Sequence, residues 1–293
     1  PTWVADWARS PTGWYPDANE HEPTPPPPDT LTMRSATVGS RPSLPRVRLD
    51  TLLLERGLVD SRTRGRALIM AGQVRVDDHP ATKAGTLVHA DAELTLVTPD
   101  HPYVGRGGLK LADALDRFQI DATGAVALDV GASTGGFTDV LLRCGATTVV
   151  ALDVGHGQLD WRLRRDERVV VLERTHIATV PPEAWPTEYR TFDIITVDVS
   201  FISVRYFVDR LAQLLRPNGD LVVLIKPQFE VGRADVGRGG VVKDPRMHER
   251  TVEDVAAAAA AVGLTRVAMA PSPITGAEGN REFFLHLRHA AAS

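Results

Sequence analysis

Residues 129–137 read DVGASTGGF, and this stretch decides the fold. It follows an apolar run at residues 125–130 and leads into residues 137–143, where the apolar spacing is helical. Glycines at such a strand-to-helix turn let the backbone bend sharply and approach a ligand closely. The spacing G-x-x-x-G-G is neither the dinucleotide fingerprint nor a Walker A loop. The turn indicates a cofactor other than NAD or ATP, and the alternative is that its glycines serve packing alone.

Further strand-like runs follow the turn, at residues 148–153, 169–173, 194–198 and 221–226. They alternate with segments of helical period, such as residues 204–215, so the pattern predicts an α/β fold with a parallel, doubly wound sheet. A helix at residues 249–262 precedes two last runs, at 265–269 and 282–287. We expect these two runs to pair as a hairpin-like antiparallel addition at the edge of the sheet.

Chemistry in such sheets lies beyond the carboxyl ends of the strands. The residues found there are Asp129, Asp153, Glu173, Asp198 and Lys226. Asp153 comes 22 residues after the first glycine of the turn, where an acid accepts both hydroxyls of an adenosine ribose. Lys226 ends a buried aliphatic run and needs a partner or a catalytic role. The plainer alternatives are that Lys226 pairs with Asp198, or that Asp198 caps a helix.

Residues 46–97 have a different pattern, with two short helices expected at 49–57 and 61–71. Alternating stretches at 73–76 and 93–97, with Asp77-Asp78 as a turn, predict a small sheet after them. This segment carries the candidate RNA-binding residues Arg46, Arg48, Arg62, Arg64, Arg66 and Arg75. A local group of arginines holds phosphates, and the alternative is an ordinary solvated helix face.

Residues 1–45 contain ten of the 21 prolines and no helical or alternating apolar period. Such a composition predicts a disordered extension, and the segment does not have the pattern of a signal peptide. Residues 98–104 form a short link to the region with the glycine turn.

The composition of the whole chain excludes several classes. The chain has 293 residues, 43% hydrophobic and 24% charged, which is ordinary for two globular domains. Its single cysteine, Cys144, excludes an internal disulfide and a multi-cysteine zinc site, and we expect no metal. No run of 18 apolar residues is present, so we expect a soluble, cytoplasmic protein without a membrane partner. The net charge of −4 confines any site for a polyanion to a local patch.

Short motifs along the chain resemble known families. Residues 46–97, through RLD (48–50), SR (61–62) and AGQV (71–74), resemble the S4 RNA-binding fold. Residues 103–287 resemble the FtsJ-type ribose 2′-O-methyltransferases through RGGLK (106–110), DVGASTGGFT (129–138), DVSFIS (198–203), KPQFE (226–230), GGVVKDP (239–245) and GNRE (279–282). Joined in this order, the two regions resemble the TlyA family of rRNA methyltransferases.

The resemblance implies a Rossmann-like S-adenosylmethionine-dependent methyltransferase sheet at residues 105–289, preceded by a small α+β S4 domain. It implies a catalytic set, which maps by local motif to Lys110, Asp198, Lys226 and Glu282. Taken alone, Lys110 could be a solvated helix residue and Glu282 an exposed edge charge. For a weakly acidic ribose hydroxyl, Lys226 is a possible base if burial and the neighbouring Lys110 lower its pKa. Asp198 and Glu282 then orient the two amines.

The resemblance also implies contacts with S-adenosylmethionine from Gly131, Ser133, Gly135, Gly136, Phe137 and Asp153. The expected function is 2′-O-methylation of cytidine in 16S or 23S rRNA, with ribosomal subunits as partners and no obligate protein partner. One alternative is a non-catalytic ribosome-binding or assembly factor. A more remote alternative is a haemolysin, but the sequence has no strongly amphipathic cationic helix to support it.

Overall fold

The computed structural model describes residues 45–290, except residues 60, 71, 82, 98–100, 182–184, 186–188, 233–234, 238 and 277–278. The expected extension at residues 1–45 therefore lies outside the described residues, apart from Pro45, and so does part of the expected link at 98–104.

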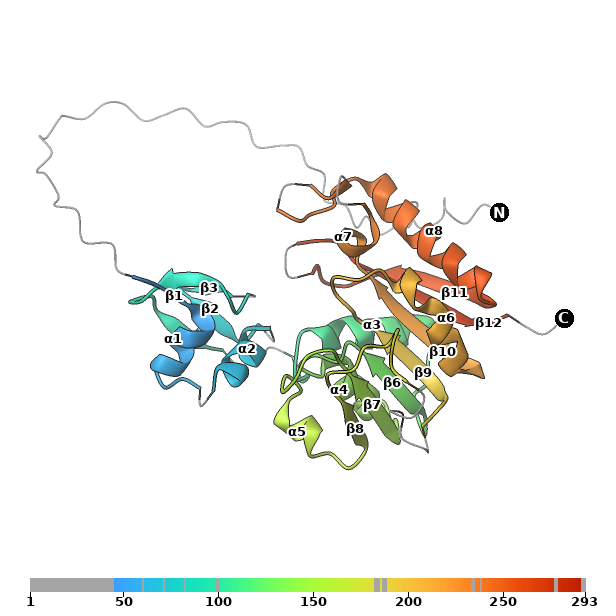
Figure 1. Cartoon of the computed structure of the whole chain (residues 1–293), viewed down its shortest axis with the longest axis horizontal. Coiled ribbons are helices and arrows are strands. Elements are labelled where there is room, and N and C mark those ends of the chain that lie inside the picture. Colours follow the sequence, from blue (N-terminus) through green and yellow to red (C-terminus); the bar gives the residue numbers. More distant parts are fainter. Residues whose placement is uncertain are drawn as a thin grey trace, which may run out of the picture. The chain divides into compact units, whose positions relative to one another are not determined.

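A seven-stranded sheet dominates the described residues (Figure 1). Its strands are β6 (Val126–Val130), β7 (Thr148–Leu152), β8 (Val169–Leu172), β9 (Phe192–Val197), β10 (Leu215–Ile225), β11 (Leu264–Pro271) and β12 (Phe283–His289). They lie in the order β11-β12-β10-β9-β6-β7-β8. The pairs from β10 through β8 are parallel, which confirms the predicted doubly wound sheet.

The last two strands pair with each other as an antiparallel addition at the edge of the sheet, which confirms the prediction. The antiparallel strand β12 lies between β10 and β11, so the edge of the sheet is β11 and not the strand that follows Glu282. The seven residues of β12 include Phe284, Leu285 and Leu287, which are fully buried. An edge strand has one free side, whereas β12 has sheet partners on both, and its apolar content suits that position.

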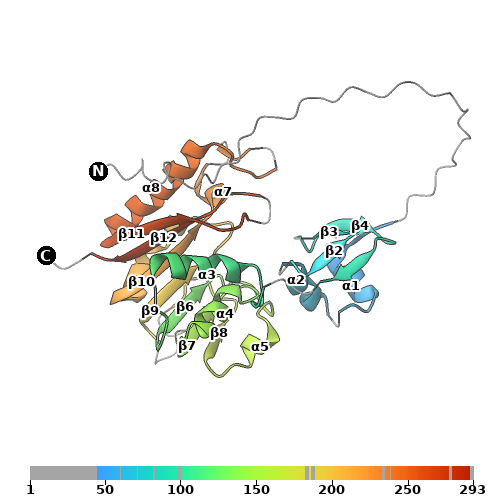
Figure 2. The same ribbon diagram turned by 180° about the vertical axis from the view of Figure 1, so that it is seen from behind.

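Helices cover both faces of the sheet (Figures 1 and 2). They are α3 (Gly107–Phe118), α4 (Gly136–Arg143), α5 (Trp161–Arg164), the 3-10 turn η4 (Val204–Tyr206), α6 (Val208–Leu214), α7 (Pro227–Glu230) and α8 (Pro245–Ala261). Alternate strand residues serve the two sides because successive side chains in a strand point to opposite faces. In β6, Ala127 packs in the cluster of α3 and α4, whereas Leu128 packs in that of α6 and α8.

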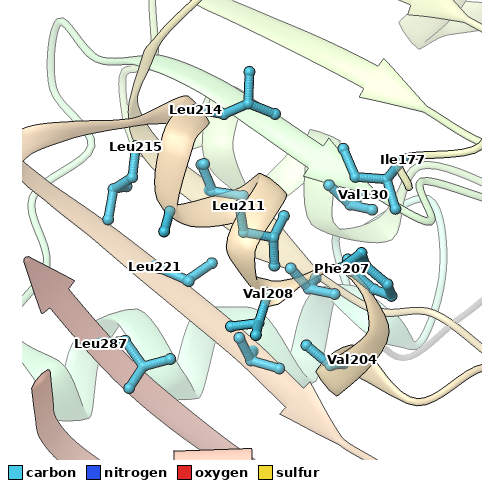
Figure 3. Close-up of a cluster of buried hydrophobic side chains, with 14 of the residues drawn as sticks. Val130, Ile177, Val204, Phe207, Val208, Leu211, Leu214, Leu215, Leu221 and Leu287 are labelled. Carbon is cyan, nitrogen blue, oxygen red and sulfur yellow. The ribbon is translucent and has the colours of Figure 1, made fainter. Parts of the chain in front are cut away.

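The core on the α6 side shows how the helix is held (Figure 3). Val208 and Leu211 of α6 lie over the sheet beside Leu221 of β10, and Phe207 enters the same cluster just before the helix. Phe207, Leu211 and Leu221 have no exposed surface. Burying side chains of this size contributes about 1.5–3 kcal/mol each relative to exposure, so this face anchors the strands whose ends form the site.

The strand order reverses at β6, which has β9 on one side and β7 on the other. In an open α/β sheet such a switch point leaves a crevice at the carboxyl ends of the two diverging strands. Gly131 follows β6 and Asp198 follows β9, so both lie at that crevice.

The N-terminal described region has its own small core, built from Leu49, Leu53, Ile69 and Val74. Its elements are β1 (Arg46–Arg48), α1 (Leu49–Glu55), α2 (Arg62–Met70), β2 (Val74–Val76), β3 (His79–Pro80), β4 (Leu87–His89) and β5 (Leu94–Leu96). The two helices and the β2–β5 pairing match the prediction. The sequence reasoning missed β1 and β4, which pair with each other, and the two-residue strand β3.

Among the described residues, no helix combines the length and the apolar character needed to cross a lipid bilayer. In the same residues, no group of three or more His, Cys, Asp or Glu side chains is arranged to hold a metal ion.

Candidate active site

The glycine turn after β6 is shaped by its contacts with the neighbouring strand. Gly131 has φ +86°, and a Cβ there would lie 2.5 Å from the carbonyl oxygen of Asp198. The amide of Asp198 donates to the carbonyl of Val130 at 2.9 Å. Glycine is required at position 131 because the chain after β9 runs directly against it.

Glycines also bring Lys110 to the crevice. A Cβ on Gly136, at the start of α4, would lie 3.0 Å from the amide nitrogen of Gly108 in α3. The first turns of α3 and α4 can therefore approach backbone to backbone, and the next residues of α3 lie at the crevice. Lys110, on the first turn of α3, is 9% exposed and hence is not a solvated helix residue.

The other three members of the catalytic set lie at the same end of the sheet. Asp198 follows β9, and Lys226 follows β10 and forms the N-cap of α7. Glu282 directly precedes β12, whose first residue, Phe283, is in register with Ile225 of β10. Because β12 is antiparallel to β10, its start meets the end of β10, and Glu282 comes beside Lys226.

The structure brings the four residues together as two ion pairs. Lys110 Nζ lies 2.5 Å from Glu282 Oε2, and Lys226 Nζ lies 2.6 Å from Asp198 Oδ1. The side chain of Glu282 is 3% exposed and that of Asp198 is 22% exposed. The four residues named from the motifs thus lie together, Lys226 pairs with Asp198, and Glu282 is not an exposed edge charge.

The electrostatics of Lys226 differ from the expectation. Burial disfavours its ammonium form, but the attraction of Asp198 and Glu282 outweighs burial and raises the pKa of Lys226 above its ordinary value. Burial likewise acts against the charged form of Asp198, yet Lys226 and Lys110 lower the pKa of that carboxyl. The expected lowering of the Lys226 pKa is wrong for this arrangement because the two acids outweigh the effect of burial.

A hollow opens beside these pairs, and its lining includes Gly107, Lys110, Gly131, Ala132, Ser133, Thr134, Gly136, Phe137 and Asp198. Four of the six predicted cofactor contacts therefore line it, namely Gly131, Ser133, Gly136 and Phe137. Among the charged residues of this lining, Asp198 is an acid, and Arg106 and Lys110 are cations. The lining thus offers a carboxylate to the sulfonium and amino groups of S-adenosylmethionine and cations to its carboxylate. The residues present fit that cofactor.

The other two predicted cofactor contacts have different surroundings. Gly135 has φ +96°, and a Cβ there would overlap the side chain of Leu163, so this glycine is required for packing. Asp153 accepts hydrogen bonds from the amide of Ser133 at 2.8 Å and from that of Gly155 at 2.6 Å. Each of its oxygens thus accepts one main-chain hydrogen bond, and an ionised carboxylate has further lone pairs with which to accept the predicted ribose hydroxyls.

Sequence reasoning missed several residues that support the set. Ser200 Oγ accepts a hydrogen bond from Lys226 Nζ at 3.0 Å. Glu230 is buried, accepts from the hydroxyl of Ser203 and from the amide of Val204, and so ties the loop after β9 to α7. These residues belong to the quoted motifs DVSFIS and KPQFE, so the polar positions next to the catalytic ones were the available signal.

Asp129, named above only as a strand-end acid, lies fully buried beneath the turn. Its carboxyl group accepts hydrogen bonds from the hydroxyl of Thr138 at 2.7 Å and from that of Thr196 at 3.1 Å. Burial raises its pKa to about 7. Asp129 joins β6, α4 and β9 from inside the protein.

The six arginines of the N-terminal region do not share one environment. Arg48 and Arg62 both contact the buried carboxylate of Asp50, at 2.8 and 3.3 Å. The pKa of Asp50 is lowered to about 2, and the largest cause is its hydrogen bond with Arg48. Arg46, Arg66 and Arg75 are exposed, and Arg64 is partly buried. Arg64 also lies two positions from both Arg62 and Arg66 on the helix, and residues two apart do not share a helix face.

Comparisons with known proteins identify the families to which the two regions are similar. The family model for FtsJ-like methyltransferases matches residues 103–289, and that for the S4 domain matches residues 47–94. The 16S/23S rRNA (cytidine-2′-O)-methyltransferase TlyA of Mycobacterium tuberculosis is 48% identical over 244 residues, which are 83% of this chain and 90% of the relative. Hemolysin A of Brachyspira hyodysenteriae is 38% identical over 240 residues, 82% of this chain and 99% of the relative.

A solved structure is also similar over most of the chain. A hemolysin candidate from Streptococcus thermophilus has a TM-score of 0.65 and 39% sequence identity, covering 85% of this chain and 90% of that chain.

Proposed function

This chain belongs to the TlyA family, in which an S4 domain precedes an FtsJ-like methyltransferase domain, and from that premise we propose that it methylates ribose 2′-hydroxyl groups of ribosomal RNA with S-adenosylmethionine. The observation that carries the proposal is the pair of lysine–carboxylate contacts, Lys110–Glu282 and Lys226–Asp198, beside the hollow at the glycine turn. The substrate nucleotide is a cytidine of 16S rRNA, 23S rRNA or both, as in the names of relatives from Mycobacterium tuberculosis and Campylobacter jejuni. The site of action is the cytoplasm, where these RNAs lie.

The cofactor would bind in the hollow against Gly131, Ser133, Gly136 and Phe137, with Gly135 and Asp153 holding the turn in shape. When bound, it supplies an electrophilic methyl group, so the substrate hydroxyl has only to be aligned and to lose its proton.

Lys226 is the group to which we assign the proton of the hydroxyl. Its amine must first lose its own proton, because Asp198 and Glu282 raise its pKa. Ser200 is exposed and contacts Nζ at 3.0 Å, so it gives a path for that proton to water. A cationic group of the ligand beside Asp198 would offset the charge of that carboxylate and so weaken its attraction for the Lys226 ammonium. The pKa of Lys226 would then fall, and the neutral amine of Lys226 could act as the base. Lys110 pairs with Glu282 and keeps that carboxylate in place beside Lys226.

The N-terminal region is the part to which we assign RNA binding. Arg46, Arg66 and Arg75 are exposed and, unlike Arg48 and Arg62, do not pair with Asp50, so they can contact phosphates. The S4 domain match at residues 47–94 supports this assignment. Accordingly we propose that residues 46–97 form an RNA-binding domain, 98–104 a link and 105–289 the methyltransferase domain. Residues 1–45 remain a proposed extension outside both.

The test is methyl transfer to ribosomal subunits from a strain that lacks the family's enzyme, read by mass spectrometry of the rRNA. We expect one added methyl group on cytidine ribose with the wild-type protein and none with Lys110→Met. Arg117→Met is the matched control, because Arg117 lies on the same helix but is exposed and pairs with Asp113. Binding of subunits without methylation by the wild-type protein would support a non-catalytic assembly factor instead.

A further inference from the structure

Two loops meet beside Glu282, and the side chain of Asn280 joins them. One loop carries Gly240 and Val242 from the motif GGVVKDP, and the other carries Gly276 and leads through Asn280 to Glu282. Asn280 is 1% exposed. A buried amide of this kind needs partners for both its donor and its acceptor.

Both ends of the Asn280 amide are used. Its Oδ1 accepts a hydrogen bond from the amide of Val242 at 2.9 Å, and its Nδ2 donates to the carbonyl of Gly240 at 2.9 Å. His248 of α8 contacts the carbonyl of Val242 at 2.8 Å and so fixes the same loop from its other side. A carboxamide supplies one donor and one acceptor from a single group, and a carboxylate has no donor.

The main chain of Asn280 links this contact to the Glu282 carboxylate. Its carbonyl accepts a hydrogen bond from the amide of Gly276 at 2.9 Å. A Cβ on Gly276 would overlap Oε1 of Glu282, so the backbone at position 276 lies directly against that carboxylate. The other oxygen, Oε2, lies 2.5 Å from Lys110 Nζ. The Glu282 side chain is therefore confined between Gly276 and Lys110.

We propose that Asn280 is a positioning residue that acts through Glu282, holding the two loops so that the Glu282 carboxylate stays against Lys110 and beside Lys226. The inference rests on the proposed methyl transfer for its effect on rate, and on geometry alone for its effect on Glu282. Loss of the Asn280 side-chain hydrogen bonds lets the two loops separate and frees the Glu282 carboxylate to move. The residues that line the hollow at the glycine turn are not changed by this loss.

The principal variant is Asn280→Asp, which keeps an acceptor for Val242 but loses the donor to Gly240 and sets a second oxygen against that carbonyl. We expect its kcat to fall by about tenfold to a hundredfold, the size of effect that misplacing a catalytic group produces, with KM for cofactor and RNA within about twofold. Asn218→Asp is the matched control because Asn218 is exposed, and it should leave kcat unchanged.

A double-mutant cycle with Glu282→Gln distinguishes positioning from a general loss of structure. If Asn280 acts through Glu282, the double variant is no slower than Glu282→Gln alone. Losses that multiply, or an unchanged kcat in Asn280→Asp, would overturn the proposal.

A measurement without turnover keeps this test separate from that of the function. In 13C NMR of the Glu282 carboxyl carbon, Asn280→Asp should move the signal, whereas Asn218→Asp should not. A signal that stays in place overturns the proposal even if wild-type activity is normal, and a shift supports it even if no rRNA is methylated.

A second variant covers the case in which Asn280→Asp does not fold. Gly276→Ala pushes on Glu282 from the same loop, and Gly232→Ala is its control because a Cβ at exposed Gly232 makes only an ordinary contact, 3.5 Å from Asp235. We expect the same fall in kcat and the same carboxyl shift for Gly276→Ala alone. Identical behaviour of the two alanine variants would contradict the inference.

Discussion

Lys226 Nζ lies 2.6 Å from Asp198 and 3.0 Å from Ser200, so substitutions there separate a proton acceptor from a fixed cation. We expect Lys226→Ala and Lys226→Arg both to lower the single-turnover rate by about a hundred- to ten-thousand-fold, because neither residue accepts a proton near neutral pH. Calorimetry should give cofactor and RNA affinities within a few-fold of wild type, since the amine acts on a proton that leaves only during the reaction.

Two controls accompany the Lys226 variants. Arg250→Ala removes an exposed cation of α8 and should keep the full rate, and thermal melting of each variant checks that Asp198 has not destabilised the fold after losing its partner. A normal single-turnover rate for Lys226→Arg would mean that the ammonium serves by its charge and that another group takes the proton.

Asp129 gives a second prediction at the residue scale, in the pH dependence of stability. Its pKa is raised to about 7 in the folded protein, chiefly by burial, whereas a free aspartate titrates near about 4. Below about pH 4 the group is protonated in both the folded and the unfolded chain and costs nothing. As the pH rises from about 4 to 7 the unfolded chain ionises first, so folding stability is progressively lost.

The variant Asp129→Asn tests this sign. An amide can accept from one threonine hydroxyl and donate to the other, and it does not titrate. We expect the difference in free energy of unfolding, Asp129→Asn minus wild type, to increase by on the order of a few kcal/mol between about pH 4 and 7. Urea titration at each pH measures this difference. A difference between the two proteins that is the same at every pH would count against the raised pKa.

At the scale of elements, the start of α4 depends on Gly135. This residue has φ +96°, and a Cβ on it would overlap Leu163 and lie 2.8 Å from Leu159. Gly263→Ala is a matched control, because Gly263 has φ +83° but open space around a Cβ. Both alanine variants bear the strain of a left-handed backbone, of roughly 1 kcal/mol, and only Gly135→Ala adds the overlap.

We therefore expect Gly135→Ala to lower Tm more than Gly263→Ala and to weaken cofactor binding by at least about tenfold, because the displaced turn no longer presents Ser133 and Gly136 to the hollow. Differential scanning calorimetry and titration calorimetry measure the two effects. Equal Tm values for the two variants, with cofactor affinity intact, would show that the turn tolerates the side chain.

The elements themselves differ in how far the sequence foretold them. The strands β6, β7 and β9 are buried on both faces, so their continuous apolar runs identified them within two residues. Short strands such as β1 and β3 have too few residues for a period, and their pairing with β4 and β2 depends on contacts distant in sequence. The place of β12 inside the sheet was likewise beyond a local pattern.

The candidate site shows the same division. The resemblance supplied all four residues of the catalytic set, and the strand-end rule independently supplied Asp198 and Lys226. Which lysine pairs with which acid, and hence the raised pKa of Lys226, follows from distances that only the folded chain fixes. The packing of Gly135 against Leu163 is likewise a contact distant in sequence, and the sequence alone does not distinguish a glycine that meets a ligand from one that shapes a turn.

At the scale of the whole molecule, RNA binding and cofactor binding should be separable. Arg66 and Arg75 are exposed, and within the part of the chain that the structure describes neither side chain makes a hydrogen bond or an ion pair. We expect Arg66→Glu together with Arg75→Glu to weaken binding to ribosomal subunits by about tenfold or more and to reduce its salt dependence, with cofactor affinity unchanged. Filter binding over a range of salt concentrations measures both quantities.

Arg62→Glu is the informative contrast to that pair. Arg62 contacts the buried carboxylate of Asp50 at 3.3 Å, so a glutamate there places two acids together and should lower Tm as well as RNA affinity. If the Arg66 and Arg75 double variant binds subunits as tightly as wild type at every salt concentration, these two arginines do not contact RNA.

The insertion of β12 between β10 and β11 has a consequence for synthesis of the protein. Lys110, Asp198 and Lys226 all precede β12, and Glu282, the fourth residue of the set, enters only with that strand. A nascent chain that has been translated as far as residue 281 includes the parallel strands and the glycine turn, yet it leaves Lys110 without its carboxylate and leaves β10 paired on one side only, with β9. Competence for methyl transfer thus requires the last strand, β12, which brings Glu282 and joins β11 to β10.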